Sequence, residues 1–333
     1  MTTNDPRDLE PIEPATAQEL YLDYKASQCS DVTVRSHEYR INHFVSWCVE
    51  NGIDNLNDLS GRDIHKFRLW RKADGGLNNI SMQTAMSTLR VFLKWAGTIE
   101  AVNPDLYNKV LVPQVDAEEE QRDVMLDAEH AGEILQYLSK YHYASREHVL
   151  FALLWETGMR IGAARSLDLR DVNLEDRFLD LVHRPETGTT LKNGRGGERL
   201  VAISVELAGL LEDYLEDTRD ERIDDYGRNP LLPGNQGRLS RSTIRRIIYE
   251  LTAPCYLDQE CPDCTGNADA KCAEAVNPHA IRRGSITHFL TCEVPVEVVE
   301  DRMDVSRKVL KKHYDRRPPG VKLEQRRRYL DQI

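Results

Sequence analysis

A segment near the C-terminus brings together an imidazole, a guanidinium and a phenol. Pro278 suits the first position of a helix, so that His279 and Arg282 share one face of the first turn. A guanidinium can hold a phosphate through two donors, and Tyr314, among cationic neighbours, is a candidate nucleophile for phosphoryl transfer. DNA cleavage is therefore a first hypothesis. The alternative is that the histidine and arginine form a solvated or capping pair and that the tyrosine is a packed aromatic.

The composition indicates a globular protein with two ordinary cores. The chain has 333 residues, of which 40% are hydrophobic and 30% are charged. It has no apolar run near the roughly 20 residues that span a bilayer, and its first residues do not resemble a signal peptide. We therefore expect a cytoplasmic protein without a membrane partner.

The charge balance argues against a nucleic-acid ligand. There are 44 Lys and Arg residues against 55 Asp and Glu, a formal net charge of −11, which has the wrong sign for binding phosphates. Two explanations make this net charge compatible with a nucleic-acid ligand. A local basic cleft can exist on an acidic protein, and a protein adapted to very high salt keeps its solubility through surface carboxylates.

Apolar periodicity predicts a small helical domain in the first third of the chain. After a flexible N-terminus at residues 1–14, helical patterns begin at Thr16, Val32, Ser60 and Ser81. We place this domain at residues 15–112. Arginines and lysines on its helices could follow a phosphate backbone, although such spread charges are also typical of solvated faces.

A second domain of mixed structure follows. Residues 113–122 are acidic and poor in apolar side chains, which predicts a linker. From residue 123 to 333 helical patterns dominate, interrupted by β-prone runs at 178–182 and 200–203. The sequence thus predicts a mainly α fold with a small antiparallel β-sheet.

The order of several motifs is more informative than any one of them. Thr157-Gly158-Met159-Arg160 is followed by Lys192 between the β-prone runs, then by His279-x-x-Arg282 and finally by Tyr314. In this order they resemble the tyrosine recombinase, or phage integrase, family of Xer-like site-specific recombinases. The resemblance covers nearly the whole chain. It implies a core-binding, SAM-like DNA-binding domain followed by a catalytic domain, and the acidic composition suggests a halophilic archaeal type.

The resemblance implies a role for the arginines and the tyrosine. Arg160 and Arg282 would clamp the non-bridging oxygens of one scissile phosphate, so no catalytic cofactor is expected. Tyr314 would attack in line and form a 3′-phosphotyrosine, which a 5′-hydroxyl of a second strand would then displace. The implied partner is double-stranded DNA, on which the protein would self-associate as a dimer to tetramer.

The remaining family residues would move protons. Lys192 would protonate the departing 5′-oxygen, with Arg195 as a rival in the same glycine-rich loop. His279 would orient the phosphate or accept the tyrosine proton. Two other functions stay open, namely a DNA-binding regulator that has reduced or lost catalysis, and a relaxing, topoisomerase-like activity.

The chain departs from the family pattern at three positions. Val305 stands nine residues before the tyrosine, where the family has a second histidine or a tryptophan, and Arg283 stands where a histidine commonly follows the second arginine. Ala163 replaces a carboxylate that steers the first arginine, with Asp168 or Asp171 as possible substitutes. Since the loss of one donor typically costs about 10²–10³ in rate, we expect a slower but working enzyme.

Four of the seven cysteines form a cluster that is absent from the family pattern. They are Cys255, Cys261, Cys264 and Cys272, in a polar insertion at residues 255–272. A disulfide framework is not expected in a cytosolic protein, whereas four thiolates can hold a tetrahedral, structural Zn²⁺. The alternative is a loop of free thiols.

The last predicted helix, at residues 321–332, is separated from the Tyr314 helix by Pro318-Pro319-Gly320. Leu323 and Leu330 share one of its faces, and a helix so separated cannot bury much against its own domain. The family resemblance implies that this segment is exchanged between protomers. The alternative is a frayed tail on its own domain.

Overall fold

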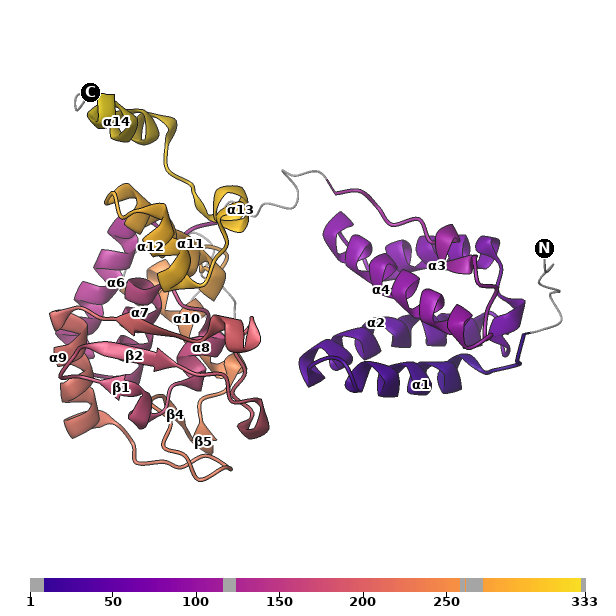
Figure 1. Cartoon of the computed structure of the whole chain (residues 1–333), viewed down its shortest axis with the longest axis horizontal. Coiled ribbons are helices and arrows are strands. Elements are labelled where there is room, and N and C mark those ends of the chain that lie inside the picture. Colours follow the sequence, from indigo (N-terminus) through magenta and orange to yellow (C-terminus); the bar gives the residue numbers. More distant parts are fainter. Residues whose placement is uncertain (1–8, 116–123, 258–260, 262–271, 331–333) are drawn as a thin grey trace. The chain divides into compact units, whose positions relative to one another are not determined.

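The computed structural model describes residues 9–115, 124–257, 261 and 272–330 (Figure 1). The chain divides into two compact units, residues 1–122 and 123–333. Most of the predicted linker 113–122 lies outside the described residues, as do residues 1–8 and most of the cysteine insertion. None of the described helices combines the length and apolarity that crossing a bilayer requires.

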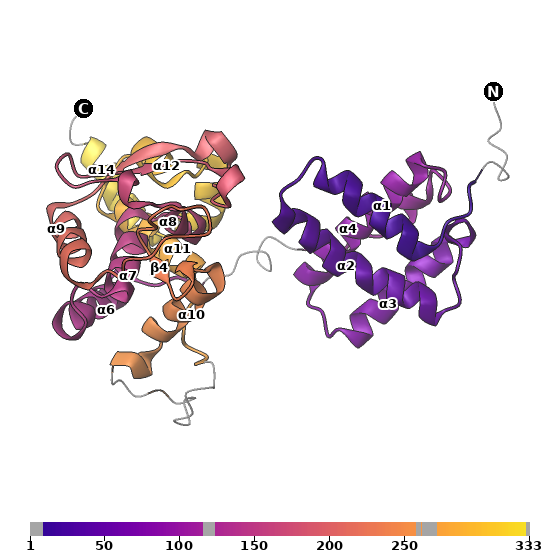
Figure 2. The same ribbon diagram turned by 90° about the horizontal axis from the view of Figure 1, so that it is seen from below.

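Four α-helices form the described part of the first unit (Figure 2). They are α1 (Pro14–Ala26), α2 (Asp31–Glu50), α3 (Gly61–Asp74) and α4 (Asn79–Thr98). The side chains of Ser60 and Asn78 cap α3 and α4 by accepting hydrogen bonds from backbone amides of the first turn. Phe44 packs edge to face on Phe67 and Phe92, which joins α2, α3 and α4 through one aromatic core.

The chain just before α1 is fixed to this bundle, within the described end of the N-terminus that was predicted to be flexible at residues 1–14. The amide of Ile12 donates to the side chain of Asn55, and the Ile12 carbonyl accepts from the Leu56 amide. Pro14 is already the first residue of α1, a position where a missing amide donor costs nothing. Composition alone did not reveal these backbone partners.

The second unit is built around one buried helix, α7 (Arg146–Thr157). Three further helices pack on it: α6 (Ala128–Tyr141), α9 (Val205–Asp213) and α11 (Pro278–Thr291) (Figure 2). Five apolar residues of α7 are buried: Val149, Leu150, Phe151, Leu153 and Leu154. Four further α-helices of the described chain are α8 (Ile161–Ser166), α10 (Arg241–Leu251), α12 (Val296–Met303) and α13 (Arg307–Val309).

A small antiparallel sheet completes this unit and confirms the predicted mainly α class. Its strands are β1 (Val172–Asn173), β2 (Phe178–Leu181) and β3 (Arg199–Ala202), in that order. A separate two-stranded ribbon pairs β4 (Pro233–Gly234) with β5 (Gly237–Arg238). The long connection from β2 to β3 is the loop that carries Lys192.

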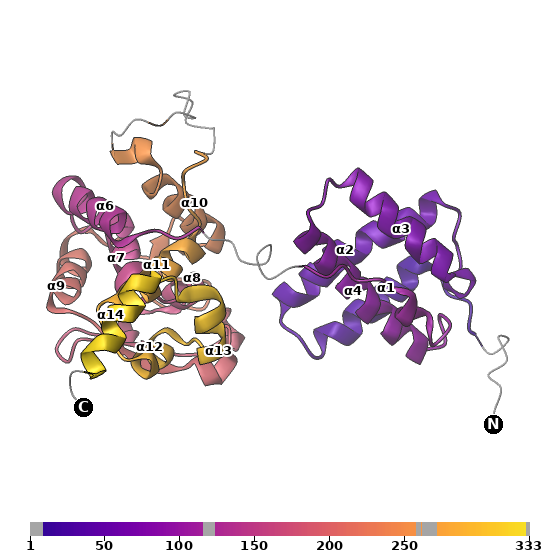
Figure 3. The ribbon, with the colours of Figure 1, turned by 90° about the horizontal axis from the view of Figure 1, so that it is seen from above.

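The C-terminal elements lie together on one side of the three-stranded sheet (Figure 1). Arg302 of α12 donates to the carbonyl of Ala202 at the end of β3. A π-helical turn, Leu310–Tyr314, ends at the candidate nucleophile. The last helix, α14, spans Pro319–Leu330 and lies near the C-terminal end of α11, where Gln325 donates to the carbonyls of Leu290 and Thr291 (Figure 3).

Candidate active site

Two glycines bring the motif segments into contact. Gly158 ends α7 with a φ of 57°, and a Cβ there would lie 2.7 Å from the sulfur of Met303. Gly284, inside α11, has no room for a side chain, because a Cβ would lie 1.8 Å from the carbonyl oxygen of Leu126. These close approaches let α7, α11 and the end of α12 converge on one point.

Arg282 lies at this point and is buried. Its Nη1 donates to the carbonyl of Gly158 at 2.5 Å and its Nη2 to the carbonyl of Asp304 at 3.3 Å. Its Nε is also buried and has no hydrogen-bond partner among the described residues, which leaves a donor for a ligand. Burial and the nearby charge of Arg160 lower the pKa of Arg282 to about 10, so the guanidinium still carries its charge at neutral pH.

Tyr314 contacts Arg282 directly. The guanidinium carbon lies 5.4 Å from the centroid of the tyrosine ring, which is a cation–π contact. The tyrosine is only 9% exposed, and its carbonyl accepts a hydrogen bond of 2.7 Å from the hydroxyl of Thr287 on α11. The candidate nucleophile is thus fixed by the helix that carries the second arginine.

Arg160 follows Gly158 and stands just before α8, with 26% of its side chain exposed. Its Nη1 donates to Oδ2 of Asp304 at 2.5 Å. Since the backbone of Asp304 also binds Arg282, the structure brings the two predicted phosphate-binding arginines to the same residue. Arg160 is the more accessible of the two.

His279 lies at the start of α11, where the side chain of Asn277 caps the helix. Its pKa is lowered, first by desolvation and then by the positive charges of Arg282, Arg283 and Arg160. An imidazole with a lowered pKa is neutral at neutral pH. It can therefore accept a proton there.

The loop between β2 and β3 contacts the site through Asn193, the residue after Lys192. Nδ2 of Asn193 donates to Oδ1 of Asp304 at 2.6 Å. Lys192 itself is exposed, and so is Arg195 in the short turn Gly194–Gly197. The loop thus lies beside Asp304, and both cations remain candidates for the proton donor.

The predicted substitutes for the missing carboxylate at Ala163 are wrong. Asp171 accepts two hydrogen bonds from Arg184, and Asp168 pairs with Arg184 and Arg238. Neither aspartate contacts Arg160 in the described part of the chain. Both carboxylates are paired with largely buried arginines, Arg184 of the β2–β3 connection and Arg238 of β5, because each buried charge needs a partner.

Sequence reasoning missed Asp304, the carboxylate that does contact Arg160. Its neighbour Val305 is 5% exposed and packs with Tyr314 in an apolar cluster. The residue at the position of the missing second histidine is therefore part of the hydrophobic core. The available signal was an acidic residue next to the anomalous valine. The contact itself joins residues that are 144 positions apart.

Part of the cysteine cluster can be described. Sγ of Cys261 lies 3.4 Å from Sγ of Cys272, while Cys255 is exposed and Cys264 lies outside the described residues. Among the residues that the structure describes, no group of three or more His, Cys, Asp or Glu could hold a metal ion.

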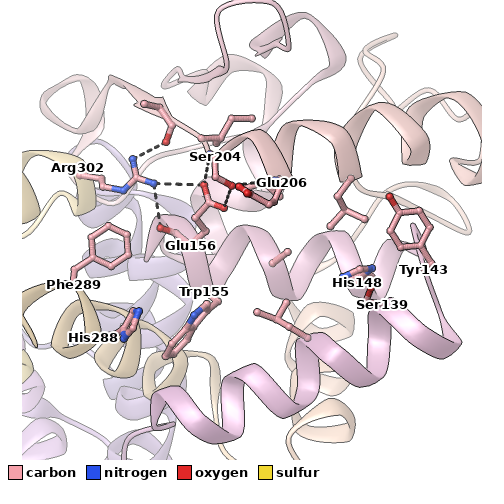
Figure 4. Close-up of a pocket in the computed structure, with 16 residues that line it drawn as sticks. Ser139, Tyr143, His148, Trp155, Glu156, Ser204, Glu206, His288, Phe289 and Arg302 are labelled. Carbon is pink, nitrogen blue, oxygen red and sulfur yellow. Dashed lines mark hydrogen bonds and ion pairs between the residues drawn. The ribbon is translucent and has the colours of Figure 1, made fainter. Parts of the chain in front are cut away.

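A separate cavity of about 850 Å³ lies between α6, α7, α9, α11 and α12 (Figure 4). In it, Arg302 donates to the carbonyl of Glu156, while Phe289 lies beneath the guanidinium, 5.4 Å from its carbon. His288 is half-buried and lies beside Trp155 in the same wall. None of the predicted catalytic residues lines this cavity.

Family models match both units. The phage integrase family model matches residues 125–317, and the model of the N-terminal SAM-like domain of phage integrases matches residues 19–98. A tyrosine recombinase of Pseudothermotoga lettingae is 24% identical over 275 residues, which cover 82% of each chain. Tyrosine recombinase XerD of Pseudomonas putida is 25% identical, over 81% of this chain and 82% of its own.

Solved structures show the same fold. The Tn1549 transposon integrase, solved with transposon right end DNA, matches with a TM-score of 0.68 at 13% identity, covering 96% of this chain and 100% of its own. A lambda integrase dimer bound to a core site matches with a TM-score of 0.65 at 14% identity, covering 92% of this chain and 79% of its own. These matches leave the predicted halophilic archaeal type without support.

Proposed function

Because the chain belongs to the phage integrase family, we propose that it is a site-specific DNA recombinase that cleaves and rejoins strands through a 3′-phosphotyrosine. The observation that carries the proposal is the contact between Arg282 and Tyr314, a buried cation against a nearly buried phenol. A purely structural tyrosine would not require a buried guanidinium with an unpartnered donor beside it.

In strand cleavage the Tyr314 oxygen attacks the phosphorus and the bond to the 5′-oxygen breaks, so that the enzyme carries a 3′-phosphodiester to tyrosine. The phenolic proton passes to His279, which is neutral at neutral pH because its pKa is lowered. The leaving 5′-oxygen takes a proton from Lys192 or Arg195. Rejoining reverses these steps with the 5′-hydroxyl of another strand.

The arginines stabilise the charge that develops on the non-bridging oxygens during both steps. Arg160 offers donors at an accessible position, and Arg282 offers its buried Nε. Donors fixed in this way need no reorganisation when the charge appears. They supply the charge stabilisation that Mg²⁺ provides in other phosphoryl-transfer enzymes, so the proposed reaction uses no metal.

A structural zinc ion at Cys255, Cys261, Cys264 and Cys272 is a second part of the proposal. The Sγ atoms of Cys261 and Cys272 are 3.4 Å apart, close to the roughly 3.8 Å expected for two thiolates on one tetrahedral zinc. The ion would tie the insertion together just before α11 without taking part in chemistry.

The proposed partners are double-stranded DNA and further copies of the chain, from dimer to tetramer. Recombination requires two DNA sites, so several active sites must act in one assembly. The net charge of −11 means that binding depends on local basic surfaces.

A DNA-binding regulator without catalysis is the second candidate, and the buried Val305 favours it, because a phosphate donor is missing there. A covalent-adduct assay separates the two. The probe is a nicked duplex built on the sequence that the purified protein enriches from random duplexes. An adduct on a denaturing gel supports the recombinase, and joined products from two sites separate it from a relaxing, topoisomerase-like enzyme.

A further inference from the structure

Asp304 contacts three separate parts of the site. One carboxylate oxygen accepts from Arg160 at 2.5 Å, and the other accepts from Asn193, next to Lys192, at 2.6 Å. Its backbone carbonyl accepts from Arg282 at 3.3 Å. One residue therefore connects both arginines with the loop between β2 and β3.

The backbone fixes this side chain in place. Asp304 ends α12 in the left-handed region, with φ 50° and ψ 61°, which aspartate, asparagine and glycine adopt more readily than other residues. The buried side chains of Met303 and Val305 flank it, and the Val305 amide donates to the carbonyl of Glu300 at 3.0 Å. The carboxylate is 14% exposed and cannot easily swing away.

The contact with Arg160 leaves most of that guanidinium available. Only Nη1 is engaged, and no other hydrogen bond to the Arg160 guanidinium is made within the described ranges. An arginine held at one nitrogen by a carboxylate has a fixed plane and can still offer its remaining donors to a phosphate. A carboxylate that blocked phosphate binding would be expected to accept hydrogen bonds from two nitrogens of the guanidinium.

The charges give the contact a second purpose. Arg160 lowers the pKa of both Arg282 and Arg199, which means that the three cations repel one another. Burial lowers the pKa of Arg199, and the negative charge of Asp304 opposes this lowering, which offsets part of the repulsion. Without a nearby carboxylate, Arg160 would tend to turn toward solvent.

We propose that Asp304 is the positioning residue of this site. It orients Arg160 toward the phosphate and keeps the Lys192 loop beside it, the task that family members assign to a carboxylate at the position of Ala163. The inference rests on the proposed recombinase function. It concerns the geometry of the arginines and not the identity of the nucleophile.

Substitutions at Asp304 test this with the nicked duplex described above. Asp304→Gly keeps the left-handed backbone and removes both side-chain contacts, while Asp304→Asn keeps the shape and loses the charge. We expect adduct formation to fall in the order wild type, Asp304→Asn, Asp304→Gly, with a loss for glycine of up to about 100-fold. Thermal unfolding of each variant identifies any that fails to fold.

Glu297→Gln is the matched control. It removes one negative charge from the same helix, where Glu297 pairs with Arg307, away from the arginine contacts. Asp304→Gly and Glu297→Gln should bind the duplex within about twofold of each other, because each removes one charge. Only the former should slow cleavage.

A double-mutant cycle shows whether Asp304 acts through Arg160. In an Arg160→Lys background the further change to Asp304→Gly should cost little, since the guanidinium it orients is gone. An equal loss in both backgrounds, or faster cleavage by Asp304→Gly than by the wild type, overturns the inference. If Arg160→Lys forms no adduct, the inference is tested by the rates of the single variants, which should fall in the order wild type, Asp304→Asn, Asp304→Gly. A wild-type protein that forms no adduct overturns the proposed function as well.

Discussion

The guanidinium carbon of Arg282 lies 5.4 Å from the centroid of the Tyr314 ring, although the two residues belong to different elements. The arginine lies near the start of α11, and the tyrosine ends the π-helical turn. The ring therefore covers a cation whose free Nε is buried. Any group that reacts at the tyrosine oxygen is held next to this positive charge.

Tyr314→Phe separates this packing from the proposed chemistry. The ring, its contact with Arg282 and the surrounding apolar cluster remain, so we expect DNA binding to persist and the free energy of unfolding to change by only about 1–2 kcal/mol. Covalent adduct should be undetectable on denaturing gels. Tyr329→Phe serves as the control, and an adduct that survives in Tyr314→Phe but not in the double variant would show that the nucleophile is Tyr329.

The lowered pKa of His279 predicts a pH profile. The neutral imidazole accepts the phenolic proton, so the rate of adduct formation should be flat near neutral pH and decline below about 6.5, once the imidazole binds a proton. His279→Gln should be slower at neutral pH and should lack this decline. If the rate of adduct formation by His279→Gln declines at the same acidic pH as the wild-type rate, the titrating group is not His279.

Elemental analysis tests the zinc proposal. Protein purified without added metal should contain about one zinc ion per chain, and Cys261→Ser or Cys272→Ser should lose it. Cys292→Ser is the matched control, because Cys292 is an exposed cysteine on another segment. Zinc-free protein whose thiols all react freely under native conditions would instead support a loop of free thiols.

Deletion of the residues after Gly320 tests whether the last helix is exchanged between protomers, as the family resemblance implies. Leu323 and Leu330 are 54% and 70% exposed on α14, so their loss should leave binding to a single site nearly unchanged. Cooperative assembly on two sites should weaken, as measured by gel shift. Leu323→Asp should act in the same direction, whereas Glu324→Gln at the neighbouring exposed position should not. A truncated protein that still joins two sites would contradict the exchange.

Local sequence patterns predicted the positions of several helices and strands. The β-prone runs at 178–182 and 200–203 correspond to β2 (Phe178–Leu181) and β3 (Arg199–Ala202). The predicted last helix, 321–332, is α14 (Pro319–Leu330), because Pro319 can occupy a first helical turn. The sequence signals that predict a strand or a helix lie within a few residues of one another, so they can be recognised without knowing the fold.

The partner of Arg160 could not be predicted in this way. Asp304 is 144 positions away, and its contact depends on how α12 ends rather than on a local motif. Asp168 and Asp171 are nearer to Arg160 in sequence, yet they pair with Arg238 and Arg184, which no local pattern places beside them. The choice among several nearby charges is made by the packed fold.

The hydrogen bonds of Arg282 have a consequence for genetics. Its substitution would leave the carbonyls of Gly158 and Asp304 without their partner, at a cost of about 1–3 kcal/mol for each buried group. Inactive alleles at this position should therefore reduce the amount of protein in the cell and behave as recessive. Alleles at Tyr314 that keep the ring should accumulate normally and enter mixed assemblies with the wild-type chain. Such alleles should be dominant, because each inactive subunit occupies a place in the complex.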